Sequence, residues 1–210
     1  MTESPYARRR RRSSARHRGP EGPAASASAA QDPEPDPREV ARAIVLRQLT
    51  ASAKSRKQLE DKLADRDVPE DVAREVLDRF EEVNLVDDAQ YAELYVRSRA
   101  GSRKLARSAI RRELATRGVS GELAEAALEQ RTDEDERADA AELVRRKLPA
   151  GPELADRTQR DRAVRRLVGM LGRKGYAPGL AFAVIKEELE ARTGAAADDD
   201  GVDEVLPDTP

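Results

Sequence analysis

The sequence predicts an all-α protein made of three tandem three-helix repeats. Across residues 37–193, apolar residues recur three and four positions apart, which is the spacing of one helix face. No segment alternates polar and apolar residues for long enough to predict a strand. A helix followed by a sharp turn is also written three times, at 56–69, 107–120 and 163–178. Stacked repeats share a core with their neighbours, so we expect an elongated, curved molecule.

The first repeat is expected over residues 37–86. Each of its three helices begins at a residue typical of a helix N-terminus, either a capping side chain or a proline. These starts are Asp36 followed by Pro37, Ser55 with Gln58 three positions later, and Pro69. Asn84 tolerates a positive φ and is expected to end the third helix.

The second repeat is expected over residues 87–131 and is basic. Asp87 and Gln90 have the spacing of a capping box at the start of its first helix. Its second helix is expected from about 103 to 117, where Gly118 ends it, and a short third helix follows.

The third repeat is expected over residues 132–193. Its first helix begins near Thr132, its long second helix ends at Gly175, and its last helix opens at Pro178. The acidic stretch 132–142 contains enough carboxylates to suggest a divalent-ion site. Asp and Glu in a first turn also offset the positive end of the helix dipole, and we favour this capping interpretation.

The three repeats align on Leu63, Leu114 and Leu171, at offsets of 51 and then 57 residues. Each of these leucines has an apolar residue four positions before it and a basic residue three positions after it. The next position, where a turn is expected, holds Asp67, Gly118 and Gly175 in the three repeats. Offsets of this length suit three helices per repeat, and the agreement at so many positions favours a true repeat over chance.

Both ends of the chain differ in composition from the helical region. Residues 1–36 are rich in Pro, Ala and Arg, with seven Arg against one Glu in the first 20 positions. Residues 194–210 hold six acidic residues and no basic one. Neither segment has the apolar residues needed to form a core, so we expect a disordered basic tail and a disordered acidic tail.

The composition argues against an enzyme. The chain has no Cys, its single His is His17 in the basic tail, and it carries no Gly-rich phosphate loop and no metal-ligand spacing. We therefore expect no catalytic residue, no cofactor and no metal site. The sequence has no apolar run long enough to cross a membrane, and its start lacks the apolar region of a signal peptide. A cytoplasmic monomer is expected, with an organellar transit peptide as the alternative.

The strongest functional signal is a cluster of basic residues. Residues 97–117 contain eight Lys or Arg and one Glu, and a second basic cluster surrounds the long helix of the third repeat. On a helix over 103–117, three of these residues would form one stripe, suited to a phosphate backbone or an acidic groove. The alternative is a solvated face that complements helix C-termini. The candidate binding residues are Arg97, Arg99, Arg103, Lys104, Arg107, Arg111, Arg112, Arg165 and Arg166.

Two aromatic residues precede the basic cluster. Tyr91 and Tyr95 lie one helical turn apart, so both rings fall on the same helix face. Stacking of these rings on nucleic-acid bases is one interpretation, but rings at this spacing more often pack in a core. We favour the core interpretation.

The stretch 55–120 resembles the RecX family, the bacterial regulators of the recombinase RecA. The family pattern has an S-R-x-x-L-x-x-K-L helix, a V-L-x-R-L helix ending in L-x-D-D, an aromatic residue followed by Ala, and R-x-R before a basic helix. The matching residues are Ser55, Arg56, Leu59, Lys62, Leu63, Val76, Leu77, Arg79, Phe80, Leu85, Asp87, Asp88, Tyr91, Ala92, Arg97 and Arg99. The resemblance extends over about 38–192. It departs at Asp67 and Asn84, turn positions where the family has Gly.

The resemblance implies three tandem three-helix repeats, no enzymatic activity and binding to the RecA–DNA filament. Lying in the filament groove, such a protein inhibits ATP hydrolysis and strand exchange, and so regulates recombination, DNA repair and the SOS response. The expected partners are the RecA filament and single- or double-stranded DNA. One alternative is a direct nucleic-acid binder of the helix-turn-helix type, which would insert a basic helix into the major groove. Another is a helical scaffold that binds only protein.

Overall fold

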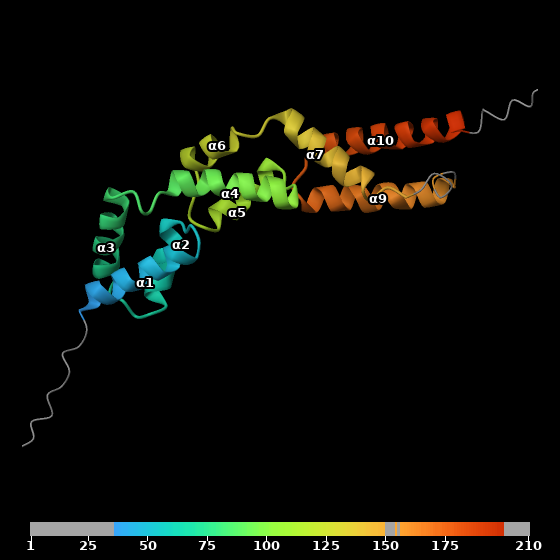
Figure 1. Cartoon of the computed structure of the whole chain (residues 1–210). Helices are drawn as coiled ribbons and strands as arrows, with labels where there is room; N and C mark the ends of the chain where they lie inside the picture. The colour runs from blue at the N-terminus through green and yellow to red at the C-terminus, as the bar shows by residue number, and fades with distance from the viewer. Residues whose placement is uncertain (1–35, 150–153, 155, 200–210) are drawn as a thin grey trace, which may run out of the picture. The chain divides into compact units, whose positions relative to one another are not determined.

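The computed structural model describes residues 36–149, 154 and 156–199. Within these residues every regular element is an α-helix, so the all-α prediction is confirmed (Figure 1). Most of the expected tails, 1–36 and 194–210, lies outside the described residues. The last helix, α10 (Pro178–Asp199), extends past the boundary expected at 193. None of the described helices is long and apolar enough to cross a membrane.

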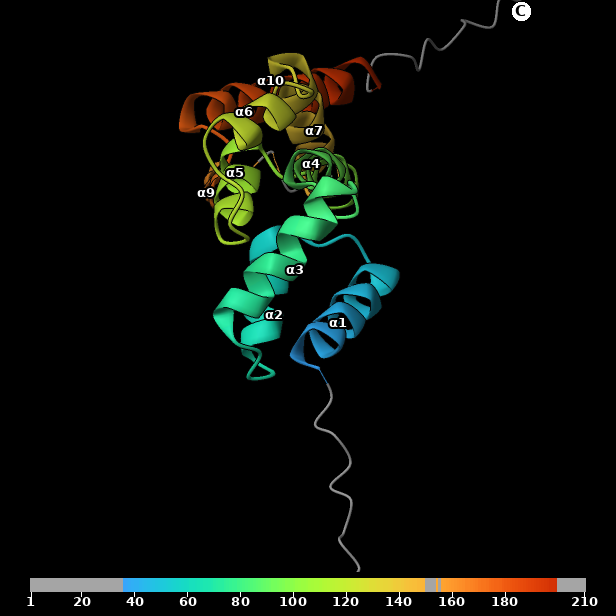
Figure 2. The same cartoon turned by 90° about the vertical axis from the view of Figure 1, so that its left-hand side faces the viewer.

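The nine helices assigned within the described residues form three groups of three. The first repeat comprises α1 (Pro37–Ala51), α2 (Arg56–Ala64) and α3 (Glu70–Glu82). The second repeat comprises α4 (Asp88–Arg103), α5 (Arg107–Ala115) and α6 (Glu122–Leu128). The third repeat comprises α7 (Asp133–Arg145), α9 (Arg157–Arg173) and α10. In each repeat the helices pack on one another, and α1 to α3 lie side by side in both views (Figures 1 and 2).

Each repeat has its own hydrophobic core. The aligned residues Leu63, Leu114 and Leu171 are fully buried, one in each of three separate clusters. Burial of a leucine side chain stabilises a fold by about 2 kcal/mol, so these positions anchor the three cores. Ala106, at the start of α5, packs in the core of the third repeat and links the second repeat to it.

The turn that follows each aligned leucine has the same geometry in all three repeats. Asp67, Gly118 and Gly175 have φ values of 57°, 81° and 88°. In each turn a backbone N–H donates to the carbonyl oxygen of the aligned leucine, over 3.2, 3.1 and 3.1 Å; the donors are Val68, Val119 and Tyr176. This hydrogen bond across a left-handed residue is a common helix C-terminus. The repeated turn predicted from the sequence is confirmed.

The predicted helix starts are also confirmed. The side chains of Asp36 and Asp87 accept hydrogen bonds from the first turns of α1 and α4. Ser55 and Gln58 form a reciprocal capping box at the start of α2. Asn84 follows α3 with a φ of 55°. These caps satisfy backbone N–H groups that have no partner inside the helix.

The second repeat contacts the first through its turn after α5. The buried Ser55 hydroxyl donates to the Arg117 carbonyl oxygen over 2.6 Å. Gly118 lies directly against the side chain of Lys57, so that a Cβ atom at Gly118 would overlap it. The turn of the second repeat therefore packs against the start of α2.

The third repeat contacts the second in the equivalent way. The Ala106 N–H donates to the Lys174 carbonyl oxygen over 3.0 Å, and the Ser108 hydroxyl donates to the Gly175 carbonyl oxygen over 2.6 Å. A Cβ atom at Gly175 would lie 2.7 Å from the Cβ of Ala109. Both joints therefore place the turn of one repeat against the first turn of a helix in the preceding repeat.

Candidate functional site

The predicted basic helix over 103–117 is wrong in its boundaries. Helix α4 continues to Arg103, Lys104 caps it with a φ of 48°, and α5 begins only at Arg107. The helix ends here because Leu105 and Ala106 are buried in the cores of the second and third repeats, respectively. The break at Lys104 lets the two side chains enter these two separate cores. Lys104 therefore does not form one helical stripe with the arginines of α5.

Lys104 is bound by acidic residues of α7. Its Nζ lies 2.6 Å from Asp139 Oδ1 and 2.8 Å from Glu142 Oε2. The hydrogen bonds to these two carboxylates raise the pKa of Lys104, so it stays charged. Its backbone carbonyl oxygen also accepts a hydrogen bond of 2.9 Å from the Tyr176 hydroxyl. Lys104 thus links the second repeat to the third through these contacts.

Arg107 and Arg111 are paired as well. Arg107 contacts Asp133 and, at 3.4 Å from Nε, the carboxylate of Glu136, both on α7. Arg111 donates two hydrogen bonds, of 2.6 and 2.7 Å, to Glu125 of α6. A two-point arginine–carboxylate contact of this kind fixes both side chains in one orientation. These arginines hold neighbouring helices together.

A compact cluster surrounds Tyr95. The guanidinium carbons of Arg99 and Arg117 each lie 4.6 Å from the centroid of its ring. Arg99 Nε also donates to Glu113 over 3.0 Å. Tyr91 is buried and stacks on Tyr95 with a centroid separation of 5.8 Å. The core interpretation is confirmed for Tyr91, and the partly buried Tyr95 packs against the same core, with two guanidinium groups and the Tyr91 ring on it rather than a base.

The acidic stretch 132–142 has two structural roles. Thr132 and Asp135 form a capping box at the start of α7, as the dipole argument predicts. The second role, which was not predicted from the sequence, is to bind the basic residues of the second repeat. The signal was present, because the four acidic residues that do so recur every three positions, which winds them in a stripe around α7. They are Asp133, Glu136, Asp139 and Glu142. Among the described residues, no group of His, Cys, Asp and Glu side chains could hold a metal ion.

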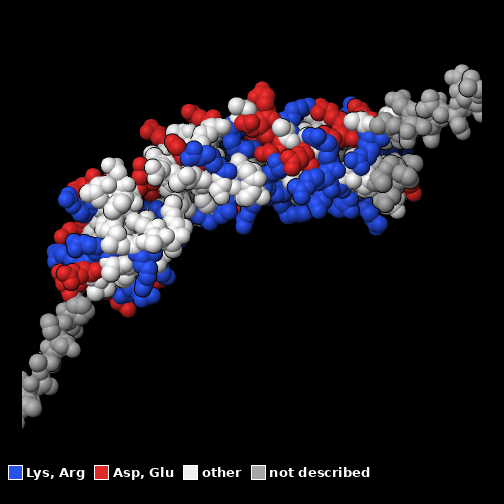
Figure 3. All heavy atoms as spheres, in the orientation of Figure 1, with Lys and Arg blue, Asp and Glu red and all other residues white. Residues whose placement is uncertain are grey.

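Helix α9 carries basic residues of a different kind. It contains six arginines and a single acidic residue, Asp161, and no ion pair joins any of these arginines to an acidic residue within the described part of the chain. Five of them are exposed, and four of these five lie, at 100° per residue, on the side of α9 away from its buried face. We call these four the α9 basic face: Arg162, Arg165, Arg166 and Arg173. Figure 3 shows Lys and Arg gathered along the edge formed by α9.

The nine candidate residues therefore divide by environment. Arg99, Lys104, Arg107 and Arg111 are engaged in ion pairs of 3.4 Å or less with side chains of other helices. Arg97 has only a 4.0 Å contact with Glu93 on its own helix. The remaining four are exposed and have no ion pair among the described residues; they are Arg103, Arg112, Arg165 and Arg166. Only Arg165 and Arg166 belong to the α9 basic face.

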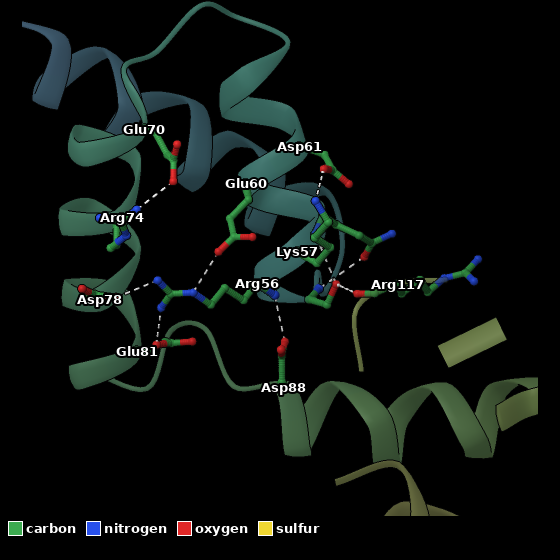
Figure 4. Close-up of polar contacts among 12 residues, drawn as sticks. Arg56, Lys57, Glu60, Asp61, Glu70, Arg74, Asp78, Glu81, Asp88 and Arg117 are labelled. Atoms are coloured by element: carbon green, nitrogen blue, oxygen red, sulfur yellow. Dashed lines mark hydrogen bonds and ion pairs between the residues drawn. The ribbon is translucent and has the colours of Figure 1, made fainter. Parts of the chain in front are cut away.

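Several residues of the family pattern also have structural roles. Arg56 contacts Glu60, Asp78 and Glu81, which ties α2 to α3 (Figure 4). Its backbone N–H donates to Asp88 Oδ1 over 2.8 Å, which ties the same point to the start of α4. Burial raises the pKa of Asp88. With Ser55 bonded to the turn of the second repeat, these side chains fix the first joint.

The fold and the surface define a protein of tandem three-helix domains that carries an exposed basic face. Known proteins share this organisation. The family patterns described as "RecX, first three-helix domain" and "RecX, second three-helix domain" match residues 41–80 and 87–128. "Regulatory protein RecX" of Streptomyces lividans is 48% identical over 172 residues, which is 81% of this chain and 89% of that protein. The same protein of Thermobifida fusca is 47% identical over 151 residues, covering 72% and 80% of the two chains.

A solved structure agrees with these matches. The crystal structure of RecX from Lactobacillus salivarius has a TM-score of 0.64 at 25% identity, and the match covers 73% of this chain and 97% of that one. The chain belongs to the RecX family of regulatory proteins.

Proposed function

We propose that this protein binds the RecA–DNA filament and inhibits its ATPase and strand-exchange activities, without catalysing a reaction itself. In this way it regulates homologous recombination and DNA repair. Membership of the RecX family supports the proposal. The observation that carries it is the α9 basic face, which offers cations that are not needed to hold the fold.

The environment of the basic residues favours some of them over others as filament contacts. A filament contact with Lys104 or Arg107 would have to compete with carboxylates already bound to them. A contact with Arg165 displaces only solvent and counterions; a contact with Arg166 also displaces a 3.3 Å hydrogen bond to the Lys147 carbonyl oxygen, but no carboxylate. Release of counterions from phosphates favours binding and makes it weaken as salt rises. We therefore place the filament contact on the α9 basic face.

The test is ATP hydrolysis by RecA on single-stranded DNA, titrated with this protein below one copy per RecA protomer. Inhibition well below a stoichiometric amount is expected, because one bound copy affects many protomers. The double variant Arg165→Ala/Arg166→Ala should require about tenfold more protein for the same inhibition, since two phosphate contacts are lost. The control is Arg74→Ala/Arg79→Ala, which removes the same charge from the exposed surface of α3.

Two outcomes would overturn the proposal. The first is no inhibition by an excess of the folded wild-type protein. The second is equal loss in the two double variants, which would show that net charge matters and the α9 basic face does not. Binding to DNA alone, with a steep salt dependence and no effect on RecA, would favour the direct nucleic-acid binder.

A further inference from the structure

A cavity of about 640 Å³ lies where the C-terminal ends of α4, α7 and α9 converge. Its volume falls within the range of about 300–1,000 Å³ that is typical of small-molecule sites. None of the four arginines of the α9 basic face lines the cavity, which α9 borders only with Met170 and the adjoining Lys174.

The wall of the cavity has an excess of positive charge. Its charged lining consists of five cations and one carboxylate: Arg103, Lys104, Arg146, Lys147, Lys174 and Glu142. Glu142 is already shared, because it lies 2.8 Å from Lys104 and 3.8 Å from Arg146. Arg103 and Lys147 have no acidic partner among the described residues. No carboxylate among the described residues therefore neutralises these two charges at the cavity.

Lys174 adds to this imbalance. Its Nζ donates to the Arg103 carbonyl oxygen, which holds the ammonium group beside the cavity. Burial, together with the nearby charge of Arg103, lowers the pKa of Lys174. Two cations held close together without a carboxylate between them repel each other, and a bound anion would relieve that repulsion.

The floor of the cavity is apolar. It is formed by Leu105, Leu143 and Met170, one residue from each of the three converging segments. A thioether and two branched side chains pack well against a flat ring, and the methionine sulfur interacts favourably with aromatic groups. The cavity thus combines an anion-binding rim with an apolar platform.

We propose that this cavity binds a nucleotide, with the phosphate against Arg103, Lys147 and Lys174 and the base on the apolar floor. The chemistry recognised is a phosphate ester beside an aromatic ring, present in a free nucleotide and in a single DNA strand. An acidic peptide would match the rim but not use the floor. The inference concerns a different surface from the α9 basic face and does not require RecA.

The first experiment is calorimetric titration of the purified full chain with dAMP, deoxyadenosine and inorganic phosphate. We expect one dAMP to bind per chain, at least about tenfold more tightly than deoxyadenosine or phosphate, because each of these lacks one half of the ligand. Failure of dAMP to bind at millimolar concentration would overturn the inference. Equal affinity for dAMP and phosphate would also overturn it, because the apolar floor would then have no role.

Variants locate the site. Arg103→Ala/Lys147→Ala should weaken dAMP binding about tenfold, whereas Arg74→Ala/Arg79→Ala, with the same change in charge, should leave it unchanged. Met170→Ala should weaken dAMP binding and leave phosphate binding as it was. Thermal unfolding of each variant checks that the fold is intact. Equal weakening in the two double variants would show nonspecific attraction and would exclude the cavity as the site.

A competition experiment separates the two sources of ligand. A single strand of about ten deoxyadenylates that displaces dAMP identifies the strand as the ligand, whereas a strand that binds without displacing dAMP identifies the free nucleotide. An acidic peptide that displaces dAMP more effectively than the strand does would overturn the nucleotide assignment. Because RecA is absent from these titrations, their outcome is independent of the ATPase test.

Discussion

The α4–α5 region and helix α9 are both rich in arginine, but they use it in opposite ways. Residues 97–117 carry eight basic residues and one acidic residue, and four of the basic side chains are bound to carboxylates of other helices. In α9, no arginine pairs with an acidic residue of the described chain. Charge density along the sequence therefore does not identify a binding surface. The distance from each cation to the nearest carboxylate in space separates the cations that hold the fold from those left available for a partner.

The largest expected difference between the two regions concerns stability. Arg107→Glu places a carboxylate beside Asp133 and Glu136, and Glu136 has only 12% of its side chain exposed. We expect the free energy of unfolding to fall by about 2 kcal/mol, because an ion pair is replaced by repulsion in a poorly solvated site. Urea denaturation measures this. A loss no larger than that of Arg165→Glu would remove the distinction between the regions.

The joint between the second and third repeats gives a smaller effect. In a double-mutant cycle of Lys104→Ala and Asp139→Ala, we expect a coupling energy of about 1 kcal/mol, since both side chains are largely shielded from water. Denaturation of the four proteins in the cycle provides the value. Its matched control is Lys186 with Glu190, an exposed pair on α10 at 3.7 Å, where coupling near zero is expected. Similar coupling in the two cycles would contradict a joint held by Lys104.

A still smaller effect concerns pH. The hydrogen bond from Arg111 holds the pKa of Glu125 below its ordinary value of 4.5. Because the folded state keeps this carboxylate ionised, the resulting stability is present above pH 4.5 and is lost as the pH falls through the lowered pKa. Arg111→Ala should therefore lose less stability on acidification than the wild type, measured as the change in Tm between neutral and acid pH. An unchanged acid dependence would show that the pair does not form in solution.

The smallest expected change in stability follows substitution of arginines in the α9 basic face. Arg165→Ala/Arg166→Ala should alter the free energy of unfolding by less than about 0.5 kcal/mol, because these side chains are exposed and hold no carboxylate. Urea denaturation of this double variant measures its stability, and the ATPase titration measures its loss of filament inhibition. Together they check that these arginines serve binding and not folding. A large loss of stability here would mean that α9, like α5, uses its arginines for folding.

Local signals were sufficient to predict most of the fold. The starts at Asp36, Ser55 and Asp87 and the left-handed turn at Gly175 depend on a side chain and a few neighbouring residues, and all four were read correctly. The end of α4 was not predicted correctly. Lys104 is an unusual left-handed residue, and it takes that conformation because Leu105 and Ala106 enter two different cores. No local pattern contains that information.

The sequence by itself determined the helical class, the repeat and the family, because periodicity, caps and turns act over short stretches of chain. It also supplied nine candidate basic residues, two of which belong to the α9 basic face. Only the tertiary structure decided which of those cations are free. The ion pairs of Lys104 and Arg107 cross from the second repeat to α7, about 30 positions further along the chain, and such pairing depends on how the repeats pack. Electrostatic attraction acts through space, so a surface becomes available for a partner only where the fold brings no opposite charge to it.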